Sequence, residues 1–205
     1  MLLETGYENT TLTGSGAAEV PSYPQAYLRL GTGDPHLELD LTAPSHTNDG
    51  TLGAKYELGY TSKAVWGANV QASLPTASRA FTAGGAQYTG NFNWGYTLNA
   101  EFSLAGTFGF DSLTGYDASG IVRRYFAFVP SLEATAALPG NAQFFAEYAY
   151  FTQAGIGLSS RSLVDFGLQK DLGPHWQVDV EYGTQPTLLN GQRAHYVGAG
   201  LAFMN

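Results

Sequence analysis

The sequence of 205 residues is long enough to form one domain with a full core, and its 44% hydrophobic content is that of a folded chain. Its 17 acidic and 9 basic residues argue against a nucleic-acid partner, because phosphate backbones are bound by an excess of Lys and Arg. The chain has no cysteine, which excludes disulfide bonds, thiolate metal ligands and cysteine nucleophiles.

Apolar and polar residues alternate along most of the chain, as they do in β-strands with one apolar and one polar face. In the clearest segment, residues 176–183, Trp, Val and Tyr side chains alternate with Gln, Asp and Glu. An even number of strands is the rule for single-chain bacterial membrane barrels. In chain order the pattern predicts about twelve strands, at residues 2–10, 25–31, 36–42, 51–60, 64–74, 87–94, 98–110, 124–136, 143–151, 163–170, 176–183 and 195–203.

The predicted connections between these strands alternate strictly between short and long. The short turns, rich in turn-forming residues, fall at 31–35, 61–63, 95–96, 139–141 and 171–174. The longer polar loops fall at 14–20, 44–50, 75–86, 111–120, 153–160 and 187–192. Tight periplasmic turns at one rim and larger outer loops at the other are typical of a transmembrane barrel. Both termini are then expected at the periplasmic rim, with the last strand closing onto the first.

The polar faces distinguish this barrel from a soluble β fold. A soluble sandwich or lipocalin-like barrel exposes its polar face to water and usually carries many Lys and Arg there. Here the polar faces hold Asn, Gln, Ser, Thr, Gly and carboxylates, and basic residues are scarce. The sequence therefore favours an all-β fold, a closed antiparallel transmembrane β-barrel formed as a single domain by residues 1–205. Aromatic residues near the strand ends would form its interfacial girdles: Tyr56, Tyr60, Trp66, Trp94, Tyr96 and Trp176.

No segment of the sequence resembles a membrane-spanning helix or a signal peptide. A spanning helix needs about 18 consecutive apolar residues, and the apolar runs are far shorter. Met1-Leu2-Leu3 is followed at once by Glu4, whereas a signal peptide has a basic start and an apolar core. Either the protein is cytosolic, or Met1 stands where a leader was removed. The barrel pattern favours the second interpretation and a bacterial outer-membrane location, with lipid and lipopolysaccharide as partners of a monomer.

Several short strand motifs resemble one family of outer-membrane proteins, described as "putative MetA-pathway of phenol degradation" and often called transporters. The resemblance spans most of the chain. It implies a barrel and the passage of small organic molecules, and it brings no catalytic residues. The motifs are PQAYLRLG at 24–31, LGAKYEL at 52–58, ASLPT at 72–76, FAEY at 145–148, VDFGL at 164–168, WQVDVEY at 176–182 and YVGAGL at 196–201.

If the apolar residues face lipid, the alternation places most of the acidic residues inside the barrel. Arg29 and Lys55 would be the main inward cations. Because the terminal strands become neighbours on closure, carboxylates near both ends are expected to crowd one wall around Arg29 and to repel one another unless paired. The predicted lumen-lining acids are Glu4, Glu8, Glu38, Asp40, Glu57, Glu101, Glu133, Glu147, Asp165, Asp179 and Glu181.

This lumen allows two interpretations. One is a passive channel for small, organic or cationic solutes. The other is a barrel closed by salt bridges among Arg29, Lys55 and the carboxylates, with a structural or adhesive role, since twelve strands lie between filled eight-stranded and open sixteen-stranded barrels. A soluble β-barrel that binds a small ligand in an apolar interior is a third alternative.

The sequence does not support an enzyme, a cofactor or a metal site. Only His195, with Asp165 and Ser159, Ser160 or Ser162, could gather as a hydrolase triad, and no motif supports it. The segment 111–120 is rich in oxygen ligands but lacks the spacing of a calcium loop.

Pro130 interrupts the predicted strand at 124–136, because proline has no N–H to donate to a ladder. A bulge or kink is therefore expected there. Such a kink would let Arg123 and Arg124 lean over the outer mouth, where two arginines could also bind lipopolysaccharide phosphates. The alternative is that the two arginines are simply the solvated base of a loop.

Overall fold

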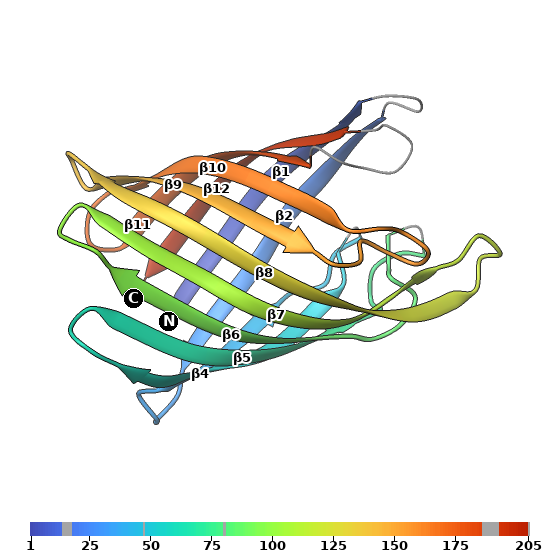
Figure 1. Cartoon of the computed structure of the whole chain (residues 1–205), viewed down its shortest axis with the longest axis horizontal. Helices are drawn as coiled ribbons and strands as arrows, with labels where there is room; N and C mark the ends of the chain where they lie inside the picture. Colours follow the sequence, from blue (N-terminus) through green and yellow to red (C-terminus); the bar gives the residue numbers. More distant parts are fainter. Residues whose placement is uncertain (14–17, 47, 80, 186–192, 205) are drawn as a thin grey trace.

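A computed structural model describes residues 1–13, 18–46, 48–79, 81–185 and 193–204. Its strands form one closed antiparallel barrel, in which each strand pairs with its neighbours in sequence and the first pairs with the last (Figure 1). The predicted all-β fold and strand number are confirmed. The strands are β1 (Leu2–Thr13), β2 (Ala18–Gly31), β3 (Leu37–Thr42), β4 (Gly50–Tyr60), β5 (Ala64–Leu74), β6 (Gln87–Thr97), β7 (Phe102–Tyr116), β8 (Val122–Leu138), β9 (Ala142–Phe151), β10 (Arg161–Asp171), β11 (Trp176–Gln185) and β12 (Arg193–Met204).

The barrel carries its large apolar side chains on the outside. On β11, for example, Val180 is 54% exposed, whereas Asp179 and Glu181 on either side of it point inward. Among the described residues no large side chain is fully buried, and the buried apolar residues are all alanines. A soluble barrel with an apolar interior therefore does not fit this fold. No helix in the described part of the chain is long and apolar enough to cross a membrane.

The connections form two different rims. The short turns 32–36, 61–63, 98–101, 139–141 and 172–175 lie at one end, which we call the short-turn rim, and both termini lie there too (Figure 1). The described residues of the connections 43–49 and 75–86, together with the connections 117–121 and 152–160, form the opposite, long-loop rim. Of the loops predicted at 14–20 and 187–192, residues 14–17 and 187–192 lie outside the described residues, and residues 18–20 belong to β2.

Two predicted connections are wrong. Gly95 and Tyr96 belong to β6, and the turn follows at 98–101, where Asn99 Oδ1 accepts hydrogen bonds from the N–H groups of Glu101 and Phe102. Residues 111–116, predicted as loop, extend β7 because they pair with β8 as far as Tyr116. The β7–β8 hairpin consequently projects beyond its neighbours at the long-loop rim (Figure 1).

The expected bulge at Pro130 is absent, because the β7–β8 ladder runs through this residue without a register shift. The N–H of Phe128 donates to Thr152 Oγ1, so the nitrogen of Pro130, two residues on, lies on the same edge of β8. That is the edge facing β9, and β8 begins to pair with β9 only at Ser131, opposite Ala149. Pro130 therefore lacks its N–H just where no β9 partner is present.

Register shifts occur elsewhere, between Gly6 and Glu8 in the β1–β2 pair and between Glu57 and Gly59 in the β4–β5 pair. In the first of these, Tyr7 faces the dipeptide 23–24 of β2, which contains Pro24. Proline within a sheet is commonly found at such bulges.

Exposed aromatic side chains lie on the outside of the barrel near the short-turn rim. Tyr96 precedes one of the short turns, and Trp176 follows another. Tyr96 is 41% exposed, and the ring of Trp176 packs on Phe203 at a centroid distance of 4.8 Å. Tyr60, expected in the same girdle, lies instead in the register row of the inward Glu133. Aromatic rings at this level are typical of the interfacial girdle of a membrane barrel.

Candidate solute pathway

The inner face of the barrel carries most of the carboxylates of the chain. Each lies two residues from another inward position and next to an exposed apolar residue, as Glu4 and Glu8 do beside Leu3 and Tyr7 on β1. Register pairing carries this inward orientation from strand to strand. The structure places these predicted acids on inward positions: Glu4, Glu8, Glu38, Asp40, Glu57, Glu133, Glu147, Asp165, Asp179 and Glu181.

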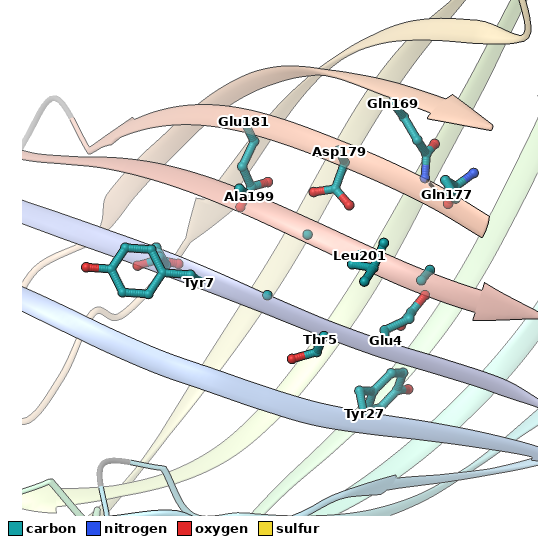
Figure 2. A pocket seen from close by; sticks show the side chains of 14 residues that line it. Glu4, Thr5, Tyr7, Tyr27, Gln169, Gln177, Asp179, Glu181, Ala199 and Leu201 are labelled. Carbon is teal, nitrogen blue, oxygen red and sulfur yellow. Dashed lines mark hydrogen bonds between the residues drawn. The ribbon is translucent and has the colours of Figure 1, made fainter. Parts of the chain in front are cut away.

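Acids from the two ends of the chain meet around one cavity of about 390 Å³. Its lining includes Glu4 and Glu8 from β1 and Asp179 and Glu181 from β11, together with Tyr27 from β2 (Figure 2). The cavity exists because β12 closes the barrel between β11 and β1. Barrel closure thus brings together residues that are more than 170 positions apart in the sequence.

The carboxylates of Asp179 and Glu181 lie along the wall, leaning toward β12 (Figure 2). Their register partners on β12 are Gly200 and Gly198. A Cβ atom at Gly198 would lie only 2.5 Å from Glu181 Oε1, and one at Gly200 would overlap the Asp179 carboxylate. The two glycines therefore leave the space in which these acids lie against the wall instead of reaching across the lumen.

A second row of acids continues from this cavity. Glu133, Glu147 and Asp165 are direct register partners on β8, β9 and β10. Asp165 is only 6% exposed, and its Oδ2 accepts a hydrogen bond of 2.9 Å from the hydroxyl of Tyr196 on β12. We call Glu8, Glu133, Glu147, Asp165, Asp179 and Glu181 together the acidic wall.

The two predicted cations lie on β2 and β4, beyond the β1 end of the acidic wall, near carboxylates of neighbouring strands. Arg29 Nη2 is 3.5 Å from Glu4 Oε2, and Arg29 is the register partner of Asp40. Lys55 is the register partner of Glu38 and lines a second cavity of about 480 Å³ with it. Arg29 therefore pairs between adjacent strands, and the expected crowding of every terminal acid around it does not occur.

The second cavity opens near the short-turn rim. Glu57 contributes to its lining, and its Oε1 lies 3.1 Å from Nδ1 of His36 in the 32–36 turn. Both side chains are substantially exposed. This pair is placed where a solute would enter or leave at that rim.

The sequence pattern did not predict one inward cation and one inward acid. Arg161 begins β10 on the inward side, with its guanidinium 4.5 Å from the centroid of the Phe151 ring and its Nη1 donating to Gln185 Oε1. Asp111 lies on the inner face of β7, and Tyr125 interacts electrostatically with both groups. The alternation Arg161, Leu163, Asp165 was the available signal, but the predicted strand began at residue 163.

One predicted lumen residue lies elsewhere, and the one conceivable hydrolase triad does not form. Glu101 lies in the 98–101 turn, outside the strands, and so does not belong to the inner wall. His195 points outward, where its Nδ1 is 2.8 Å from the Tyr182 hydroxyl, whereas Asp165 faces inward. No hydrolase triad can form from groups on opposite faces of one wall. In the described residues no group of three or more His, Asp and Glu side chains could hold a metal ion.

The barrel is similar to several solved outer-membrane proteins. The NanC porin has a TM-score of 0.68 at 13% identity, covering 98% of this chain and 100% of its own. The KdgM porin, in complex with disordered oligogalacturonate, has a TM-score of 0.65 at 10% identity, covering 100% and 99%. An outer-membrane channel from Pseudomonas putida F1 has a TM-score of 0.67 at 14% identity, covering 98% and 94%. These likenesses establish a porin fold.

Sequence comparison gives a family but no characterised relative. The model of the family described as "Putative MetA-pathway of phenol degradation" matches residues 7–203. No curated protein matches the chain.

Proposed function

Because the chain belongs to the "Putative MetA-pathway of phenol degradation" family, whose expected barrel it forms, we propose that it is a passive channel of the bacterial outer membrane. The channel passes small solutes and prefers cationic or neutral polar ones. In the membrane the short-turn rim faces the periplasm and the long-loop rim faces outward, as in other barrels of this kind.

The charge distribution inside the barrel carries this proposal. Among the described residues the inward cations are Arg29, Lys55 and Arg161, and the first two lie beside acids of adjacent strands. No inward cation lies within the acidic wall. Fixed charges of one sign along a narrow aqueous path raise the local concentration of counter-ions and select permeating solutes by charge.

The polar contacts of the inner face favour an open path over a plugged barrel. Gln143 donates to Gln169 on the adjacent strand, and Gln169 donates to Gln177 on the next. Asn93 Nδ2 likewise donates to Asn69 Oδ1 on the adjacent strand at 2.7 Å. These bonds run around the wall between close strands, so they stiffen the barrel without crossing its lumen.

The acidic wall also separates this channel from one for acidic sugars. The KdgM porin, of the same fold, was solved with oligogalacturonate, a chain of carboxylated sugars. An anion of that kind would be repelled by the carboxylates here. The proposed solute class is therefore cationic or uncharged.

Reversal potentials in a planar bilayer with a KCl gradient test the proposal. The wild-type protein should conduct and be cation-selective, and Asp179→Asn with Glu181→Gln should reduce the cation-to-anion permeability ratio. Glu101→Gln is the control, since it removes a carboxylate outside the strands and should leave the ratio unchanged. Absence of conductance would support the plugged or adhesive barrel and refute the proposal of a channel. Anion selectivity would refute the solute preference.

A further inference from the structure

The exterior of the barrel has an apolar groove across β3 to β7. Two outward register rows form it: Leu39, Ala54, Val70, Gly90 and Phe110 in one, and Leu52, Ala72, Tyr88 and Ser112 in the other. The small residues Ala54, Ala72, Gly90 and Ser112 make its floor, and Leu52, Val70, Tyr88 and Phe110 make its sides. Its volume is about 630 Å³. We call it the outer groove.

The floor of the outer groove is open at its centre. A Cβ atom added at Gly90 would meet no other atom within 4 Å, so the space above this residue is not filled by the protein. Val70 and Phe110, on either side of Gly90 in the same row, are each 64% exposed. Apolar surface of this kind on the outside of a membrane barrel is in contact with lipid chains.

A guanidinium closes the end of the outer groove nearest the long-loop rim. The side chain of Arg124 reaches from β8 across β7 to the start of β6, where it lies 5.5 Å from the centroid of the Tyr88 ring. Its Nη1 donates to the carbonyl and the hydroxyl oxygens of Ser112, and its Nη2 donates to the carbonyl of Ala86. Tyr88 and Ser112 also line the groove, so the cation and the apolar surface are parts of one site.

The bonds of Arg124 fix its position and leave donors for a ligand. A guanidinium has five N–H donors, and the three bonds to Ser112 and Ala86 use part of them. Within the described part of the chain, these bonds leave the Nε–H and one N–H of Nη2 as donors. Two N–H donors of one guanidinium can bind the oxygens of a phosphate in a bidentate contact.

We propose that Arg124 and the outer groove form a binding site for lipopolysaccharide of the outer leaflet. A lipid A phosphate binds the guanidinium, and one of its acyl chains lies in the groove over Gly90. The charge of Arg124, its level at the long-loop rim and the continuity of cation and groove favour a phosphorylated outer-leaflet lipid. The site rests on the proposed membrane location, but it is independent of whether the lumen conducts.

Native mass spectrometry of the refolded protein in neutral detergent, titrated with purified lipid A, tests this site. Arg124→Gln should weaken lipid A binding at least about tenfold, as expected for the loss of charge-assisted hydrogen bonds. Arg123→Gln is the matched control. It removes the same charge from the preceding residue, whose Nε donates a hydrogen bond to Asp117 at the hairpin tip. This control should bind as the wild type does.

Two further measurements test the groove and the identity of the lipid. Gly90→Leu places a side chain in the groove at a position where a Cβ atom meets no other protein atom within 4 Å, so it should weaken lipid A binding while the barrel keeps its heat-modifiable migration on gels. Phosphatidylglycerol should bind the wild type more weakly than lipid A. Equal losses in Arg123→Gln and Arg124→Gln, unchanged binding in Gly90→Leu, or equal affinity for phosphatidylglycerol would each overturn the proposal, whatever the conductance.

Discussion

At the tip of the β7–β8 hairpin a single carboxylate organises the turn. Asp117 Oδ1 accepts hydrogen bonds from the N–H groups of Ile121 and Ser119, and its Oδ2 accepts one from Arg123 Nε. The bond from Ile121, followed by the one from Arg123, holds the pKa of the Asp117 carboxyl below its usual range.

This lowered pKa predicts the pH dependence of the hairpin tip. Because the pKa is lower in the folded turn than in a disordered one, the stabilisation is present above the ordinary carboxyl pKa of about 4 and is lost as the pH falls through the folded value. We expect the protection factors of the Ile121 and Ser119 amides in micelles, measured by NMR against the intrinsic exchange rate at each pH, to fall as the pH drops below about 4. Asp117→Asn should abolish that pH dependence. The same acid transition in both proteins would contradict this role.

Arg161 is the inward cation farthest from the short-turn rim, and it opposes the charge of the acidic wall. We expect Arg161→Gln to raise the cation-to-anion permeability ratio by roughly twofold to tenfold, which corresponds to about 0.4–1.4 kcal/mol. The matched control is Lys170→Gln, since Lys170 lies on the outward face of the same strand and changes the net charge equally. Reversal potentials measure both, and equal shifts would show that only the overall charge matters.

Between neighbouring strands, aromatic side chains lie over glycines. The Tyr196 ring lies over Gly183 of β11, which lets its hydroxyl reach Asp165 on β10, two strands away. A methyl group at Gly183 would overlap this ring, so Gly183→Ala should destabilise the barrel by about 1–3 kcal/mol, the usual range for overpacking. Urea unfolding in lipid vesicles measures the change. Gly90→Ala, at an open site, should alter the stability by no more than about 0.5 kcal/mol.

The period-two alternation predicted every strand of the barrel, because each strand has apolar surroundings on its outer face and polar surroundings on its inner face along its whole length. It failed where other interactions determine the structure. Residues 111–116 have the composition of a turn but are strand because β8 pairs with them. Gly95 and Tyr96 also have the composition of a turn, but they belong to β6 and pair with β5. The turn itself follows them, and in it Asn99 Oδ1 accepts a hydrogen bond from the N–H of Glu101.

The inner wall could be predicted in outline but not in its contacts. Inward parity is fixed by alternation, so Glu147 and Asp165 could be placed on it from the sequence alone. Which acid meets which cation depends on the register between strands: the β1–β2 register brings Glu4 to Arg29, whereas the β11–β12 register gives Asp179 a glycine, Gly200, as its partner. The lean of Asp179 toward Gly200 is a matter of packing, for which the sequence pattern carries no signal.

Over the whole molecule the excess of acidic residues and the mean hydropathy both result from two surfaces of different character. The mean hydropathy of −0.12 averages an apolar exterior and a polar interior residue by residue. The formal net charge of −8 lies largely on inward strand positions, where the acidic wall forms one continuous patch. A membrane barrel of this kind therefore has the composition of an ordinary acidic soluble protein.

This concentration of charge predicts that selectivity depends on ionic strength. The screening length is about 10 Å at 0.1 M salt and about 3 Å at 1 M. At the higher concentration the acidic wall should act only on ions close to it, so the cation-to-anion permeability ratio should fall toward unity between 0.1 M and 1 M KCl. The difference between the wild type and the Asp179→Asn, Glu181→Gln variant should shrink in parallel. A ratio that stays constant over this range would mean that ions are selected by direct contact at a narrow point, and the diffuse field of the acidic wall would then have no part in selectivity.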